Sequence, residues 1–463
     1  MFTHSAQSDG PESQRDRTAP PSGPSVEGPD RSPSPQAGTR TDRIKKALLS
    51  LMPGIFLIGY NIGTGSLTAM SKAGANYGTD LLWAVLLSCV ITWYLINFFS
   101  RFTMITGLTA MEAFRRHIHP AYAWGLWAAL SVIILSALMA MIGLLADVVV
   151  VWCRESWAVE ASRGWVGVAL ALGVYGLILV GNTKRFEAML GVMVALMGIA
   201  FIGSAIRFFP GVDVVLQGFV PKLPAVAEGS DNSALVILAS MVGTTVSVFA
   251  FLIRSGQMKD HGWTMADWPI QKRDALVSAT MMFILSAAVM LTATATLHVD
   301  GHKMNHIKEI IPMLDPLFGP LALMVFTLGI LAAGISSHLP NMMVIPWLSD
   351  DMAGRPRNNH TPIKIAVFAG LTLLSMLGAV MDRPVFLLLL SQAGISVVMP
   401  LALFGLMYLS SRNDLMQGSR PRPVEWIALI AIGCFTLFMS TQAIRGLLTD
   451  ITPMFLAVMQ SPG

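Results

Sequence analysis

The chain has 463 residues, of which 54% are hydrophobic and 13% are charged, and its mean hydropathy is +0.62. Soluble domains carry about 25% charged residues, so this chain has too little polar surface to cover itself in water. The composition excludes a cytosolic enzyme, a nucleic-acid binder and a disulfide-stapled secreted domain. The three cysteines, Cys89, Cys153 and Cys434, lie far apart and lack the spacing of a metal site. A formal charge of +4 is modest and indicates no polyanionic partner.

Residues 1–43 differ in composition from the rest of the chain. They hold eleven charged side chains, are rich in Pro, Ser, Gly and Arg, and contain few large apolar residues. Such a segment buries too little surface to offset the entropy lost on ordering, so we expect a disordered cytoplasmic tail. It has no apolar stretch followed by a small-residue cleavage site, so we expect no removable signal peptide.

Charge-free stretches predict the membrane-spanning helices. A helix needs about 20 apolar residues to cross about 30 Å of hydrocarbon, and eleven stretches after residue 44 reach or approach that length. The sequence therefore predicts an all-α polytopic membrane protein with eleven transmembrane helices. The stretches, bounded by charged residues, are 46–72, 80–101, 116–154, 163–184, 187–207, 231–254, 274–300, 315–350, 364–382, 383–412 and 425–445.

The orientation follows from the lysines and arginines of the connecting segments. With the N-terminus inside, 19 of them fall on the cytoplasmic side and nine on the other side. Because cytoplasmic loops carry an excess of Lys and Arg, we expect a cytoplasmic N-terminus in the plasma (inner) membrane. An odd number of spans then places the C-terminus on the extracytoplasmic side.

Two predicted helices carry polar or glycine-rich interruptions near their middles. The first contains Gly63-Thr64-Gly65-Ser66, and the sixth contains Gly243-Thr244-Thr245 followed by Ser247. Gly lowers helix propensity, and Ser and Thr side chains compete for backbone hydrogen bonds. Small residues also serve close helix packing in membranes, which is the alternative interpretation.

The positions of the interruptions favour a transport site. Each falls in the first helix of a group of five, and transporters with inverted repeats build their substrate sites from paired discontinuous helices. We therefore predict a transporter core at 44–409, in which helices 1–5 pair with helices 6–10. The remaining segment, 410–463, is predicted to form a peripheral eleventh helix and a short C-terminal tail.

A series of short motifs runs along the chain in a characteristic order and spacing. The motifs are Gly54 with its apolar run, Ala73-Gly74-Ala75, Tyr77-Gly78, Leu81-Leu82-Trp83, Arg101 with Thr106-Gly107, Ala332-Ala333-Gly334-Ile335-Ser336-Ser337, and Ser391-Gln392-Ala393-Gly394-Ile395-Ser396 ahead of Pro400. Taken together, over about Met52 to Leu409, they resemble the NRAMP family of proton-coupled divalent-metal transporters. The resemblance implies a LeuT-like fold of two inverted five-helix repeats, and secondary active transport by symport of protons and metal ions such as manganese.

The chain departs from the family at the metal-ligand motifs. In helix 1, where the family has Asp-Pro-Gly-Asn, this chain has Gly63 to Ser66. In helix 6, where the family has Met-Pro-His, it has Ser247, Val248 and Phe249. The helix-10 glutamine is retained as Gln392. Of two acids in the family's helix 3, one is kept as Asp147 and the other place holds Leu144.

These departures leave hydroxyls, one amide and free carbonyls around the interruptions. Neutral oxygen ligands suit a hard cation that keeps some water, such as Mg²⁺, and equally a monovalent ion or a polar organic solute. The predicted substrate site comprises Gly63, Thr64, Ser66, Thr244, Ser247 and Gln392, with Thr64, Ser66 and Gln392 as metal ligands.

Asp147 is the one acid well inside a predicted span, and an intramembrane carboxylate is by default a functional candidate. We predict an ion-coupling role for it. The alternative is a residue near the outer mouth of the helix, because Trp152 and Arg154 follow closely.

The predicted function is secondary active transport of a divalent metal ion by alternating access. No nucleophile elbow, Walker loop or ATP-binding domain is recognisable, so we expect neither enzymatic activity nor a cofactor. The expected partners are the metal ion or another small substrate and the lipid bilayer, and the sequence predicts no oligomeric state. The alternatives are a proton- or sodium-coupled carrier of a small organic solute or monovalent ion, and a non-transporting membrane receptor.

Overall fold

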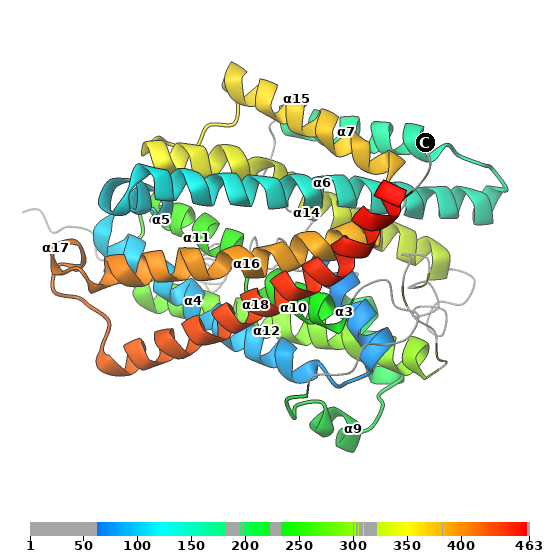
Figure 1. The fold of residues 1–463 in the computed structure, drawn as a ribbon, viewed down its shortest axis with the longest axis horizontal. Coiled ribbons are helices and arrows are strands. Elements are labelled where there is room, and N and C mark those ends of the chain that lie inside the picture. Colours follow the sequence, from blue (N-terminus) through cyan, green and yellow to red (C-terminus); the bar gives the residue numbers. More distant parts are fainter. Residues whose placement is uncertain are drawn as a thin grey trace, which may run out of the picture. The chain divides into compact units, whose positions relative to one another are not determined.

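The computed structural model describes residues 63–180, 195, 198–222, 233–299, 301, 304, 309, 322–381 and 383–460. This part of the chain is helical and contains no β-strand, which confirms the predicted all-α class (Figure 1). Its helices are α3 (Thr64–Tyr77), α4 (Leu82–Thr106), α5 (Ala110–Ala113), α6 (Pro120–Trp157), α7 (Arg163–Val180), α9 (Val212–Gln217), α10 (Ala234–Thr245), α11 (Val248–Asp260), α12 (Trp268–Ala293), α14 (Ala322–Ala353), α15 (Pro362–Met376), α16 (Pro384–Ser411), α17 (Asn413–Met416) and α18 (Pro423–Gln460), with short π-helical turns at Phe114–Ile118 and Thr294–His298 and 3₁₀ turns at Met265–Asp267 and Leu377–Val380.

Nine helical segments within the described residues are long and apolar enough to cross a membrane, and each coincides with a predicted span. The first and fifth predicted spans are described only in part, as α3 and as the apolar helix Gly198–Arg207. The predicted tail at 1–43 lies outside the described residues. The last helix, α18, runs on to Gln460, beyond the predicted end of the eleventh span.

The helices pack as two groups. In the first helix group, α3, α4, α10, α11 and α12 contact one another, and in the second helix group α6, α7, α14 and α15 do so. Helix α16 contacts α6 of the second group and α10 of the first, and it also packs against α18. Helix α6, which begins at Pro120 and has 38 residues, is long enough to contact both α14 and α16.

The sixth predicted span is broken where the sequence indicated. Helix α10 ends at Thr245, Val246 (φ −89°, ψ 63°) and Ser247 (φ −86°, ψ 116°) leave the helical conformation, and α11 starts at Val248. The apolar window of this span is buried throughout. Non-helical backbone at membrane depth is tolerated only where protein or a water-filled cavity surrounds it, and this burial meets that condition.

A glycine next to the break allows α10 and α16 to approach closely. A Cβ atom built on Gly243 would lie 2.0 Å from the backbone oxygen of Gln392. Backbone cannot move aside as the end of a flexible side chain can, so a side chain at this position forces the two helices apart.

We expect Gly243→Ala to lower the thermal unfolding midpoint in detergent, because overpacking of this kind costs about 1–3 kcal/mol. The matched control is Gly173→Ala in α7, where an added Cβ meets no atom within 4 Å. The control should be as stable as the wild type or more so, because Ala is the better helix former. Equal midpoints for the two variants would contradict the close approach.

Between α11 and α12 lies a fully buried ion pair. Arg254 Nη2 is 2.5 Å from Asp274 Oδ2, and the two side chains are 0% and 1% exposed. The same guanidinium donates to the Gln271 side-chain oxygen. Removing one member of a buried pair strands the charge of the other, which costs more than removing both.

We therefore expect Asp274→Asn to destabilise the folded protein by about 3–5 kcal/mol, and the Arg254→Met/Asp274→Leu double variant to recover most of that loss. Thermal unfolding monitored by circular dichroism in detergent measures both. Asp414→Asn, which removes an exposed partner of Arg412, is the control and should change stability little. A double variant no more stable than Asp274→Asn would refute the charge-stranding account.

Candidate functional site

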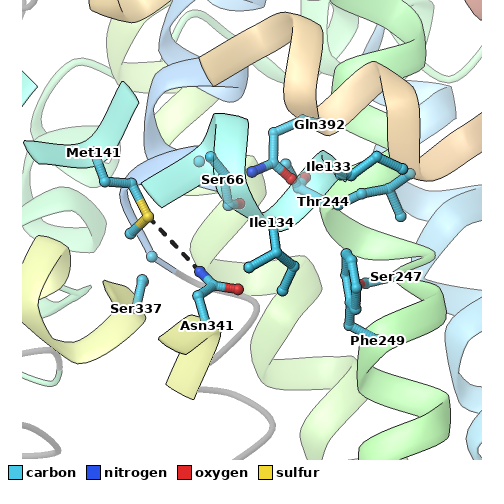
Figure 2. Close-up of a pocket in the computed structure, with 14 residues that line it drawn as sticks. Ser66, Ile133, Ile134, Met141, Thr244, Ser247, Phe249, Ser337, Asn341 and Gln392 are labelled. Atoms are coloured by element: carbon cyan, nitrogen blue, oxygen red, sulfur yellow. Dashed lines mark hydrogen bonds between the residues drawn. The ribbon is translucent and has the colours of Figure 1, made fainter. Parts of the chain in front are cut away.

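The break in the sixth span opens onto a cavity of about 40 Å³ (Figure 2). Residues of both helix groups and of α16 line it, so it lies where the two groups meet. The lining residues are Gly63, Gly65, Ser66, Ile133, Ile134, Ala137, Met141, Thr244, Ser247, Phe249, Ser337, Asn341, Gln392 and Ile395.

Five of the six predicted substrate-site residues line this cavity: Gly63, Ser66, Thr244, Ser247 and Gln392. Thr64 is not among the lining residues. It is fully buried in the first turn of α3, and its hydroxyl has no hydrogen-bond partner within the described residues.

Helix α3 begins at the cavity wall, at the first predicted interruption. Gly63 is its N-cap residue, with an extended backbone (φ −110°, ψ −163°) and no side-chain cap. A Cβ atom on Gly63 would lie 1.5 Å from Ser337 Oγ, and one on Gly65 would lie 2.7 Å from Gln392 Nε2. The two glycines therefore let the start of α3 fit between α14 and α16.

The ends of the broken helix bring opposite partial charges to the site. The last turn of α10 carries carbonyls without intrahelical donors, and the first turn of α11 carries free N–H groups. The Thr92 hydroxyl donates to the Thr245 carbonyl at 2.7 Å. Thr244 lies in the same turn and lines the cavity.

No charged residue is among the described residues that line the cavity. Its polar groups are hydroxyls, the amides of Asn341 and Gln392, and the Met141 thioether. Within the described part of the chain, no three His, Cys, Asp or Glu side chains come together in a group that could hold a metal ion. Among the described residues, the groups that can balance a cation in this cavity are therefore dipoles and not carboxylates.

Asp147 lies in α6 beyond Met141 and does not line the cavity. Its Oδ1 is 2.5 Å from Nε of Arg163, the first residue of α7, and both side chains are partly exposed, at 29% and 25%. The charge of Asp147 is thus matched by a neighbour at the connection between α6 and α7.

Ser337, Asn341 and Met141 are lining residues that sequence reasoning missed. Ser337 and Asn341 are four residues apart in α14, so they share a helix face. The signal available in the sequence was two polar residues, four positions apart, in a largely apolar stretch of α14. Met141 carried no signal, because the chain has 30 methionines and most stretches of α6 are apolar.

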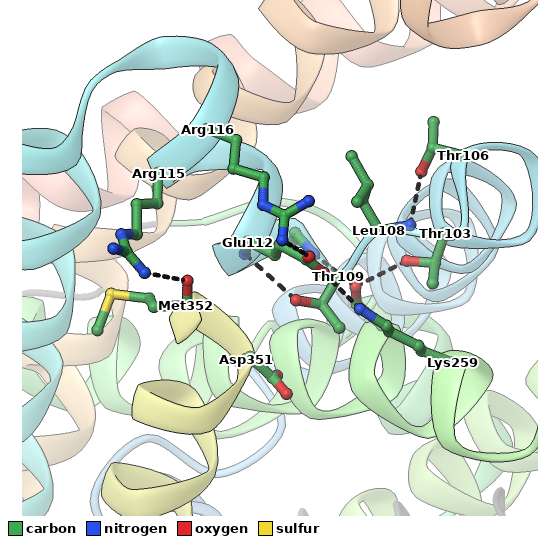
Figure 3. Close-up of polar contacts among 12 residues, drawn as sticks. Thr103, Thr106, Leu108, Thr109, Glu112, Arg115, Arg116, Lys259, Asp351 and Met352 are labelled. Atoms are coloured by element: carbon green, nitrogen blue, oxygen red, sulfur yellow. Dashed lines mark hydrogen bonds and ion pairs between the residues drawn. The ribbon is translucent and has the colours of Figure 1, made fainter. Parts of the chain in front are cut away.

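Ion pairs gather at the C-terminal end of α11, away from the break (Figure 3). Glu112 of α5, only 2% exposed, binds Lys259 Nζ at 2.5 Å and Arg116 Nη2 at 2.9 Å. Arg357 binds Asp351 at 2.8 Å and Asp260 at 3.4 Å. These contacts connect the end of α11 to α5 and to the end of α14.

Arg357 stays charged within this cluster. Burial lowers the pKa of its guanidinium, but the carboxylates around it, Asp351 foremost, raise the pKa by more, so the net direction is upward. Its guanidinium carbon also lies 5.1 Å from the centroid of the Trp347 ring, a cation–π distance.

Comparison with known proteins agrees with this architecture. The chain is 25% identical over 383 residues to "Divalent metal cation transporter MntH" of Erwinia tasmaniensis, covering 80% of this chain and 88% of the relative. It is 25% identical over 391 residues to the protein of the same name from Acidiphilium cryptum, covering 79% and 83%. A crystal structure of a manganese transporter from Eremococcus coleocola matches with a TM-score of 0.72 at 13% identity, covering 93% of this chain and 91% of that one.

A family profile also matches most of the chain. The profile described as "Natural resistance-associated macrophage protein-like" matches residues 54–445, which include α3, both halves of the broken span and α16. The chain therefore belongs to the Nramp family.

Proposed function

We propose that the protein is a secondary active transporter of divalent metal ions, driven by protons and working by alternating access. The observation that carries this proposal is the cavity at the break between α10 and α11, where five predicted site residues come together. Membership of the Nramp family and the names of the MntH relatives support it. The metal ion is the cargo, and transport requires neither a cofactor nor a catalytic step.

The size and chemistry of the cavity support a small cation as cargo. A volume of about 40 Å³ holds roughly three water molecules, enough for an ion with part of its hydration shell. The neutral ligands proposed are the Ser66 hydroxyl, oxygens of Thr244 and Ser247, and the Gln392 amide oxygen, with Thr64 close by in α3.

Alternating access requires the two helix groups to move relative to each other around the cavity. The ion pairs of Glu112 and Arg357 join the end of α11 to α5 and α14, so we propose that they close the cytoplasmic side. This assignment uses the predicted topology, with the N-terminus cytoplasmic and the C-terminus outside the inner membrane. The proposed coupling role of Asp147 requires its ion pair with Arg163 to open during the cycle.

The test is metal uptake by purified protein in proteoliposomes that enclose metal-sensitive fluorophores for Mn²⁺ and Mg²⁺. The wild type should take up at least one of the ions, faster when the outside is acidic. Contacts to a charged group are worth about 1.5–3 kcal/mol, so Gln392→Ala should weaken apparent affinity about tenfold or more. Ser66→Trp should abolish uptake because the indole fills the cavity.

Gln442→Ala is the matched control, because Gln442 lies in α18 and does not line the cavity. It should retain wild-type uptake. A wild type that moves neither ion, while an organic solute or a monovalent ion is accumulated, would replace the metal proposal with that alternative. A wild type that accumulates nothing would favour the non-transporting receptor.

A further inference from the structure

The wall of the cavity formed by α6 carries a sulfur atom. Met141 is 2% exposed and lines the cavity, and it is the one sulfur-containing residue among the described lining residues. Figure 2 shows it on the side opposite Ser247 and Phe249. The break therefore faces a thioether that belongs to the other helix group.

A neighbouring side chain holds this sulfur in place. Asn341 of α14 donates its amide nitrogen to Met141 Sδ at 3.7 Å (Figure 2). Methionine has three rotatable bonds and takes many conformations when nothing directs it. The amide donor uses one lone pair of the sulfur and leaves the other for a ligand, so this contact selects a conformation in which the thioether stays at the cavity.

Sulfur changes which ions the cavity prefers. Hydroxyl, carbonyl and amide oxygens suit hard ions such as Mg²⁺ and Ca²⁺, whereas thioethers suit softer metals. Ser247 brings only oxygen from the broken span. The soft ligand in this cavity therefore comes from Met141 of α6 and not from the residues at the break.

We propose that Met141 is a metal ligand of this transporter and that Asn341 is its positioning residue, so that the cavity selects soft divalent ions over hard ones. The proposal rests on the function proposed above and adds the residue that sets metal preference. Ligation then comes from both helix groups: oxygens from α3, α10 and α16, and sulfur from α6.

The test compares Cd²⁺ and Mg²⁺, a soft and a hard divalent ion, in proteoliposome uptake and in calorimetric binding to the purified protein. Met141→Leu keeps the volume and removes the sulfur. It should lower the ratio of Cd²⁺ to Mg²⁺ uptake about tenfold, equal to about 1.4 kcal/mol. Cd²⁺ binding should weaken by a similar factor, and Mg²⁺ uptake should fall by much less than Cd²⁺ uptake does.

Two further variants separate ligation from packing. Met139→Leu makes the same change in the same helix at a residue that does not line the cavity, and it should leave the ratio unchanged. Asn341→Leu removes the donor to Sδ and should lower the ratio less than Met141→Leu does. Since exchange of Met and Leu in a core costs under about 1.5 kcal/mol, folded Met141→Leu protein is expected for the assay.

The outcomes distinguish the two proposals. A wild type that neither binds nor takes up any divalent metal would overturn the function itself. A wild type that transports both ions, with the same Cd²⁺ to Mg²⁺ ratio in Met141→Leu, would leave the function standing and overturn the role of Met141. An equal drop in Met139→Leu would also overturn it, because the effect would then be one of packing.

Discussion

Unpaired peptide groups in the middle of a membrane are the constraint on which this structure depends. A helix that stops at Thr245 and restarts at Val248 frees N–H and C=O groups where lipid offers no partner, at a cost of several kcal/mol each. The surrounding helices offset that cost by hydrogen bonding to these groups and by burying the segment. Thr92 of α4 donates to the Thr245 carbonyl, and the apolar window of the Ala234–Asp260 span is buried throughout. Thr244, Ser247 and Phe249, at and beside the break, line the cavity, so the packing that permits the break also creates the site.

The described charged residues near the cavity pair with one another, and none of them lines it. Arg254 and Asp274 compensate each other between α11 and α12, Glu112 is held by Lys259 and Arg116, and Asp147 is paired with Arg163. An isolated carboxylate in an empty cavity would have to be desolvated without a partner. A neutral cavity avoids that cost when empty. In exchange, a bound dication must keep more of its hydration water, or contact more protein dipoles, than it would in a site with a carboxylate.

Much of this arrangement follows from residue patterns along the chain. Apolar length and charged boundaries predict all nine of the spans within the described residues. They do so because every span needs a long enough apolar helix to cross the hydrocarbon. The interruption at Gly63 predicts where α3 begins, and the one at Gly243 predicts the break after Thr245. The reasons for individual residues are less visible, because they depend on neighbours from distant helices: Gly65 and Gly243 both accommodate Gln392, and Asp147 meets Arg163 only after the chain turns back. Met141 stands in an apolar run like any other methionine, and only the position of Asn341 distinguishes it.

The proposed division of ligands between the helix groups has a consequence for transport. Oxygens of Ser66 and Thr244 belong to the first helix group, whereas Met141 and Asn341 belong to the second. An ion that binds to both groups stabilises the conformation in which they are close, by the free energy of the ion–ligand interactions that break when the groups separate. The same division makes release favourable once the groups part, because each group alone offers an incomplete and uncharged set of ligands. A neutral site shared in this way binds its ion through geometry more than through charge, so its affinity changes steeply as the helix groups move.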